Sequence, residues 1–176
     1  LAGRAWYEEI VYLLWYGKLP TSKQLRLFRS TLSSEMRMPS QVTDLVASAP
    51  PSANPMVVLR TAVSALGMFD PDGGKNSEAA NQRKARRVLA QVATIVAAMI
   101  RLRAGDKPVS ADKDLGFAEN SLYMLRGKPP GKTETAAFDT MLMLHADHGL
   151  AASTFTARVA VSTLAGMHSA ISAALA

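Results

Sequence analysis

The chain has 176 residues, of which 48% are hydrophobic and 19% are charged, and its formal net charge is +6. This composition is typical of a globular domain with a sizeable core, and it excludes an intrinsically disordered segment. The absence of cysteine excludes disulfides, thiolate metal sites and cysteine nucleophiles, and it suits a reducing compartment such as the cytoplasm.

The first third of the chain has the periodicity of helices. A helix is predicted over residues 6–16, because apolar residues occur on most of its turns and Gly17 ends it. Thr21 is the expected N-cap of a second helix over residues 22–36. A short third helix begins at Pro39. The pattern therefore favours helices joined by short loops.

The middle of the chain continues in the same way. Pro55 suits the first turn of a helix, and helices are predicted over residues 55–69, 78–103, 114–125 and 133–145. No stretch alternates with the two-residue period of a strand, and no repeat of 20 to 50 residues is present. The predicted fold class is all-α, with about eight helices and no significant sheet, in a single helical unit over residues 1–176.

An uncharged run, VAVSTLAGMHSAISAALA, occupies residues 159–176. Its length raises the possibility of a membrane span, but its serine, threonine and glycine content favours a helix buried inside a packed protein. No membrane association is therefore expected. The run contains no helix stop signal, and the chain begins at Leu1 without a recognisable signal peptide, so we expect an internal fragment of a longer protein.

The densest basic cluster is QRKARR, residues 82–87. No aromatic residue is interleaved with it and no nucleic-acid recognition module surrounds it, so nucleic-acid binding is not expected. We interpret the cluster as a solvated helix face. A basic surface of this kind also suits anionic small molecules.

Two of the three histidines of the chain lie close together in MLMLHADHGL, residues 141–150. His145, Asp147 and His148 could form a metal site or a substrate site, or the two histidines could be ordinary core residues. The H-E-x-x-H spacing of zinc proteases is absent, and a third ligand would have to come from Glu134, Asp139 or a distant residue, so no metal site is expected.

Other catalytic motifs are also absent. The sequence contains no G-x-S-x-G elbow, no G-x-G-x-x-G loop and no G-x-x-x-x-G-K loop. His148 falls at a helix boundary, where an imidazole can donate a hydrogen bond to a carboxylate or a ketone oxygen of a substrate. Spacing alone, however, favours the simpler interpretation of a histidine satisfied by a backbone carbonyl.

Four stretches resemble, in order, characteristic segments of the citrate synthase family. They are YEEIVYLLWYGKLPT at residues 7–21, NPMVVLRTAVSALG at 54–67, FAENSLYMLRGKPP at 117–130 and LMLHADHGLAASTFTARVAVST at 142–163. The last is highly specific, and together the four cover most of the chain. The resemblance implies an all-α homodimer with a large helical domain and an inserted small domain. This chain would be the N-terminal part of the large domain, without the small domain and the C-terminal segments.

The resemblance also implies a reaction. The family condenses acetyl-CoA, as a substrate rather than a cofactor, with oxaloacetate to give citrate and CoA in the tricarboxylic acid cycle. An alternative is 2-methylcitrate synthase, which uses propionyl-CoA. A non-catalytic helical binding or scaffold protein that retains the fold is the alternative from another class. Homodimerisation is expected through the apolar helices at residues 57–66 and 159–176.

The family motif assigns roles to the histidine pair. His148 would hold oxaloacetate, and His145 would support it. The later catalytic histidines, the catalytic aspartate and the carboxylate-binding arginines are expected beyond Ala176, so the chain is expected to contain no catalytic residue and to be inactive alone. Three positions depart from the family pattern, with Gly149 for glutamate, Ala151 for asparagine and Asn54 for histidine. The departures place the usual substrate specificity in question.

Overall fold

The structure, a computed structural model, describes residues 4–147 and 149–176. Within those residues it contains nine α-helices and no strand, so the all-α prediction is confirmed. The helices are α1 (Tyr7–Tyr16), α2 (Ser22–Ser34), α3 (Ser40–Ser48), α4 (Pro55–Phe69), α5 (Glu78–Arg103), α6 (Phe117–Arg126), α7 (Lys132–Leu144), α8 (Ala152–Ser162) and α9 (Met167–Ala174).

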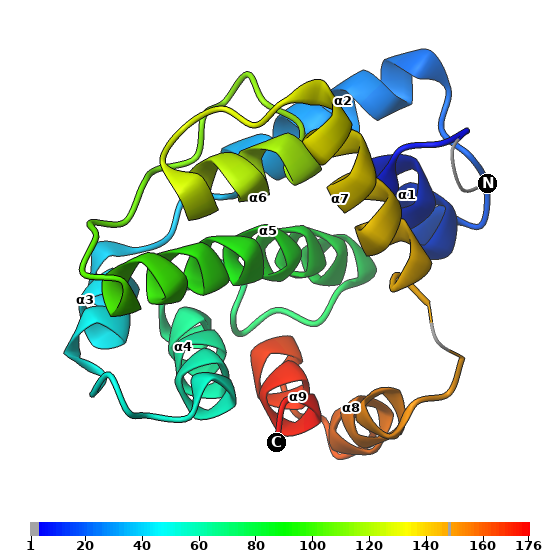
Figure 1. The fold of residues 1–176 in the computed structure, drawn as a ribbon. Helices are drawn as coiled ribbons and strands as arrows, with labels where there is room; N and C mark the ends of the chain where they lie inside the picture. Colours follow the sequence, from blue (N-terminus) through cyan, green and yellow to red (C-terminus); the bar gives the residue numbers. More distant parts are fainter. Residues whose placement is uncertain (1–3, 148) are drawn as a thin grey trace.

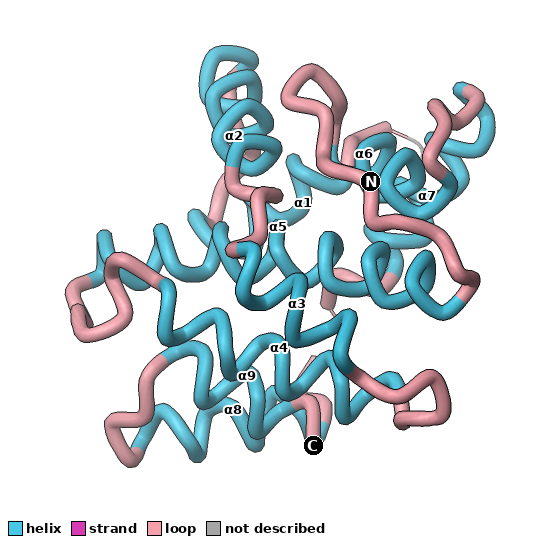
Figure 2. Tube along the Cα trace, turned by 90° about the vertical axis from the view of Figure 1, so that its left-hand side faces the viewer, coloured by secondary structure: helices cyan, strands magenta, loops and turns pink. Residues whose placement is uncertain are grey.

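The long helix α5 runs through the middle of the molecule and separates two groups of helices (Figure 1). α1, α2, α6 and α7 lie on one side, and α3, α4, α8 and α9 lie on the other, an arrangement that Figure 2 shows from the side. One buried apolar cluster joins α5 to α3 and α4, and a second joins it to α1, α2 and α6. Because α5 contributes to both clusters, it fixes the position of each group.

Local signals in the sequence explain where several helices begin and end. The side chain of Thr21 accepts a hydrogen bond from the backbone N–H of Gln24 at 3.3 Å and so caps α2. Ser77 caps α5 in the same way. α1 ends at Gly17, whose φ of +71° lies in the left-handed region that glycine adopts without strain. These ends agree with the sequence prediction.

The uncharged C-terminal run is not the single buried helix that we expected. α8 ends at Ser162, and Leu164 adopts a φ of +64° in the turn before α9. α8 has no buried residue, whereas α9 buries His168 and Ala170. This break gives nine helices where about eight were predicted. None of the helices in the described part of the chain is long and apolar enough to cross a membrane.

Candidate functional site

The position of α7, which carries His145 at its end, is fixed by a buried carboxylate. Asp139 accepts hydrogen bonds from the backbone N–H of Tyr7 at 3.1 and 3.2 Å. Tyr7 begins α1, and a carboxylate is favourable at a helix N-terminus. α7 is thereby held beside α1, as Figure 1 shows.

His145 is the C-cap residue of α7, and its side chain is exposed. Its Nδ1 lies 2.7 Å from the carbonyl oxygen of Met141. A carbonyl only accepts hydrogen bonds, so Nδ1 carries the proton. In the neutral imidazole Nε2 is then an acceptor, and in the protonated ring it becomes a donor. His145 is satisfied by a backbone carbonyl, but it keeps one nitrogen for a ligand.

A tight turn follows His145. The carboxylate of Asp147 accepts a hydrogen bond from the backbone N–H of Gly149 at 3.0 Å, and Gly149 has a φ of +68°. His148, which the resemblance assigns to oxaloacetate, lies outside the described residues, so its role stays a prediction.

Two departures from the family pattern occupy helix N-caps. The side chain of Asn54 accepts a hydrogen bond from the backbone N–H of Met56 at 2.8 Å and caps α4. Ala151 is the N-cap of α8, and its methyl group offers no acceptor to the N–H groups of the first turn. Asn54 therefore has a structural role, whereas Ala151 leaves α8 without a side-chain cap.

We expect Ala151→Asn to stabilise α8. An asparagine oxygen at this position can accept from the N–H of Ser153 or Thr154, which is worth about 1 kcal/mol of stability. The midpoint of thermal unfolding, with hydrogen exchange along α8, measures the change. Ala152→Asn, one residue further on, is the matched control and should give no stabilisation. An unchanged or lower midpoint for Ala151→Asn would contradict the capping argument.

Both carboxylates considered as further metal ligands are already engaged. Asp139 binds the N-terminus of α1, and Glu134 accepts a hydrogen bond from Arg126 at 2.7 Å. Hydrogen bonds from Arg126 and from the N–H of Gly131 lower the pKa of Glu134 to about 2. Within residues 4–147 and 149–176, no cluster of three or more histidine, aspartate or glutamate side chains could hold a metal ion.

A buried cluster of charges joins the end of α4 to α5. Arg87 donates to Asp70 from Nε at 3.0 Å and from Nη2 at 2.6 Å, and Nη2 also lies 2.8 Å from Asp72. Arg83 makes a second two-pronged contact with Asp72, at 2.8 and 2.9 Å. The paired, planar geometry is the strong form of the arginine–carboxylate interaction.

The expectation of a solvated face for the QRKARR segment is therefore wrong in part. Arg87 and Lys84 are both buried, and Nζ of Lys84 donates to the carbonyl oxygen of Lys75 at 2.5 Å. The physical reason lies in the turn that follows α4, which places two aspartates over this face of α5. Only part of the basic segment is accessible to an anionic partner.

His168 on α9 faces the same charge cluster and was not singled out from the sequence. Its Nε2 lies 3.6 Å from a carboxylate oxygen of Asp70 and has no hydrogen-bond partner among the described residues. Burial lowers the pKa of His168; Asp70 opposes this shift, and the charges of Lys84 and Arg87 add to it. The ring is therefore neutral near pH 7.

Close packing of α4 and α9 places His168 there. A Cβ atom added at Gly67 on α4 would lie 3.1 Å from the Cβ of His168. A side chain larger than hydrogen at position 67 would push α9 away from α4. The pairing of Gly67 with His168 spans about a hundred residues of sequence, so no local pattern could have revealed it.

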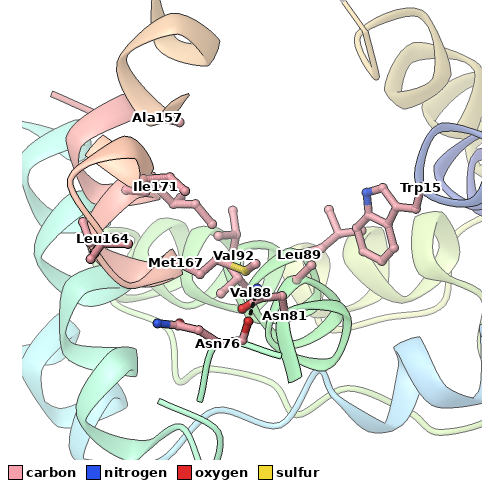
Figure 3. Close-up of a pocket in the computed structure, with 14 residues that line it drawn as sticks. Trp15, Asn76, Asn81, Val88, Leu89, Val92, Ala157, Leu164, Met167 and Ile171 are labelled. Atoms are coloured by element: carbon pink, nitrogen blue, oxygen red, sulfur yellow. Dashed lines mark hydrogen bonds between the residues drawn. The ribbon is translucent and has the colours of Figure 1, made fainter. Parts of the chain in front are cut away.

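An apolar cleft of about 710 Å³ lies between α1 and α5 on one side and α8 and α9 on the other. Figure 3 shows Trp15 across the cleft from Ile171 and Ala157, with Val88 and Leu89 along its floor. The amides of Asn76 and Asn81 lie at its base, and among the residues that the structure describes no charged side chain lines it. Two amides in an otherwise apolar lining do not offset the desolvation of two carboxylates, so such a cleft does not suit a dicarboxylate.

A family model described as "Citrate synthase, C-terminal domain" matches residues 1–176. Citrate synthase 2 of Bacillus subtilis is 44% identical over 176 residues, which cover 99% of this chain and 47% of the relative. A 2-methylcitrate synthase of Mycobacterium tuberculosis is 41% identical over 175 residues, covering 99% and 44%. The chain thus spans about half the length of these curated relatives.

Solved structures agree with these relatives. The crystal structure of citrate synthase from Pyrobaculum aerophilum superposes with a TM-score of 0.93 at 34% identity, over 99% of this chain and 46% of that one. Citrate synthase from Thermoplasma acidophilum, in a ternary complex with carboxymethyl coenzyme A and oxaloacetate, superposes with a TM-score of 0.90 at 29% identity, over 97% and 45%.

Proposed function

The chain belongs to the citrate synthase family, and we propose that the protein condenses acetyl-CoA with oxaloacetate to give citrate and CoA. The observation that carries the proposal is the 44% identity to a citrate synthase over 99% of this chain. The complex of the Thermoplasma acidophilum relative with oxaloacetate and a coenzyme A derivative supports the substrate class. We also place the protein in the cytoplasm, which the absence of cysteine suits.

The histidine pair supplies the oxaloacetate contacts in this proposal. His148 donates to a carboxylate or to the ketone oxygen of oxaloacetate, and His145 supports it through the nitrogen that Met141 leaves free. The third histidine, His168, is buried against Asp70 and takes no part. In this proposal, the groups that remove the α-proton of the thioester and polarise its carbonyl are not among residues 1–176. This chain alone is therefore inactive. It corresponds to the N-terminal part of the large domain.

A second candidate is condensation of propionyl-CoA with oxaloacetate. It is favoured by the relative named 2-methylcitrate synthase, whose 41% identity is nearly that of the citrate synthase. Gly149 and Ala151, which depart from the family pattern, follow His148 closely in the sequence, so they could also affect which of the two reactions the protein catalyses. A difference of a few per cent in identity to the two relatives does not decide whether the protein uses acetyl-CoA or propionyl-CoA, because these thioesters differ by only one methylene group.

Steady-state kinetics of the full-length protein test both candidates. CoA release is measured with oxaloacetate and either thioester, and we expect a higher kcat/KM with acetyl-CoA. One methylene group is worth about 1–3 kcal/mol in a fitted pocket, so the preference should be about tenfold or more. The opposite preference would assign the second candidate. No CoA release with either thioester would favour a non-catalytic scaffold that retains the fold.

Homodimerisation is part of the proposal, and exposed apolar side chains support it. Met56 and Val57 at the start of α4 are 48% and 45% exposed, and Phe155, Val159 and Val161 on α8 are exposed by about half. α8 packs against no described helix except α9. We expect sedimentation of the full-length protein to give twice the monomer mass at micromolar concentration. A folded monomer under those conditions would count against the dimer.

A further inference from the structure

A second, smaller pocket lies where α1, α2 and α5 meet. It is on the side of α5 that faces away from α9. Its volume is about 310 Å³. We call it the Arg86 pocket, and its lining includes Tyr12, Tyr16, Gln24, Leu27, Phe28 and Arg86. Among the described residues the lining contains one cation and no carboxylate, so any charge that the pocket selects is negative.

Arg86 differs from its basic neighbours because no carboxylate pairs with it. Arg83 and Arg87 are held by Asp72 and Asp70, whereas Arg86 forms no ion pair within the described residues. Glu35 lies near it but approaches Arg87, at 4.0 Å. The basic segment at residues 82–87 suits an anionic small molecule, and Arg86 is the arginine of that segment that no carboxylate of the described residues occupies.

The guanidinium of Arg86 is only partly satisfied. Nη1 donates a long hydrogen bond, 3.4 Å, to the hydroxyl of Tyr16. Nε is buried and has no hydrogen-bond partner among the described residues. The Nη groups carry the rest of the donor capacity, and no carboxylate of the described residues contacts them. A ligand carboxylate would supply two acceptor oxygens to these groups, and its charge would offset the cost of the partly unsatisfied guanidinium.

The rest of the pocket is aromatic. The rings of Tyr12 and Tyr16 lie 4.3 Å apart, and Phe28 meets Tyr12 edge-on at 5.5 Å between centroids. The amide oxygen of Gln24 accepts from the backbone N–H of Thr21 at 2.9 Å, which leaves the amide NH₂ group as a further donor. Aromatic walls of this kind stack on or contact a flat apolar ring.

From this geometry we infer that the Arg86 pocket binds a small aromatic carboxylate. The carboxylate contacts the guanidinium of Arg86, and the ring lies against Tyr12 and Phe28. The pocket volume is at the lower end of the range for small-molecule sites and suits a single-ring ligand. The inference is independent of the condensation reaction, because the pocket lies between α1, α2 and α5, whereas His145 of the proposed oxaloacetate site ends α7.

The test uses the purified protein with benzoate as the probe. Titration is followed by isothermal calorimetry and by the NMR signal of the Arg86 Nε–H group, which should shift and saturate. Benzyl alcohol keeps the ring without the charge, and acetate keeps the charge without the ring. Each should bind at least about tenfold more weakly than benzoate. Equal binding of benzyl alcohol, or tighter binding of inorganic phosphate, would overturn the inference.

Variants separate Arg86 from general surface charge. Arg86→Gln should weaken benzoate binding about tenfold or more, and Arg86→Lys should retain part of the affinity. Arg26→Gln removes an exposed arginine of α2 outside the pocket and is the matched control, with unchanged affinity expected. Unchanged affinity in a folded Arg86→Gln variant would refute the site. Should that variant fail to fold, the comparison of benzoate with benzyl alcohol on the unmodified protein still decides.

Discussion

Arg87→Met should lower the free energy of unfolding by about 3–5 kcal/mol, because it leaves a buried carboxylate without its partner. The side chain of Asp70 is only 2% exposed, and Arg87 supplies two of its hydrogen bonds. After the change, Asp70 faces His168 at 3.6 Å and the backbone N–H of Asp72. Chemical denaturation at pH 7 to 8 measures the loss.

The pH dependence of this loss has a definite sign. Burial alone would raise the pKa of Asp70, but hydrogen bonds from Arg87 and from the Asp72 N–H, together with the charge of Arg87, lower it on balance. The native carboxylate therefore contributes stability that is present above its usual pKa and is lost as the pH falls below it. Without Arg87 the pKa of Asp70 should rise, so protonation relieves the variant and the difference from the unmodified protein shrinks on acidification.

His168 adds a second step at higher pH. Because its pKa is lowered by burial, the neutral ring contributes stability that is present above the usual histidine pKa and is lost as the pH falls through the lower, folded-state value. In Arg87→Met a protonated His168 can pair with Asp70, so this step should weaken or reverse. A pH series of denaturation midpoints separates the two steps.

Two further variants check the argument. Arg83→Met removes a partner of Asp72 that is 42% exposed, and Asp72 keeps Arg87 and Lys75, so a much smaller loss is expected. Asp70→Asn combined with Arg87→Met removes both charges and should recover part of the stability, since replacing a whole buried pair is less costly than breaking it. A loss in Arg83→Met equal to that in Arg87→Met would show that burial is not the deciding factor.

The helices were predictable where a local signal sets their ends. Gly17 ends α1, Thr21 caps α2 and Pro55 begins α4, and each of these is a property of one residue and its immediate neighbours. The break between α8 and α9 had no such signal, because Leu164 adopts a positive φ that its residue type disfavours. Backbone hydrogen bonds across the turn support that conformation, together with the packing of the two helices against each other and of α9 against α4.

The charge cluster was not predictable for a related reason. A turn can bring Asp70 and Asp72 close to Arg87, because the three residues are near one another in the sequence. The same sequence pattern is also expected when the basic helix face is simply solvated, so the sequence does not distinguish the two arrangements. His168 joins them from about a hundred residues away. Arg86 differs from Arg87 only by which side of α5 it occupies, and that side is set by the packing of α1 and α2. Tertiary contacts decided both cases.

His148→Ala in the full-length protein should weaken oxaloacetate binding while leaving the fold intact. A charge-assisted hydrogen bond of about 1.5–3 kcal/mol corresponds to a loss of about ten- to a hundredfold in affinity. Oxaloacetate binding measured by calorimetry, together with the melting temperature, gives the two quantities required. A core histidine would give the reverse result, with a lower melting temperature and unchanged affinity. A metal ligand would give the loss of a stoichiometric metal in elemental analysis.

His145→Ala is the matched comparison and should be milder for oxaloacetate. Its Nδ1 is committed to the carbonyl oxygen of Met141, so only Nε2 can meet a ligand, and the side chain is exposed. Loss of the Met141 contact should instead loosen the end of α7 and the turn at Gly149 that follows it. An equal or larger loss of oxaloacetate affinity in His145→Ala would reverse the assignment, making His145 the principal contact and His148 the residue that supports it.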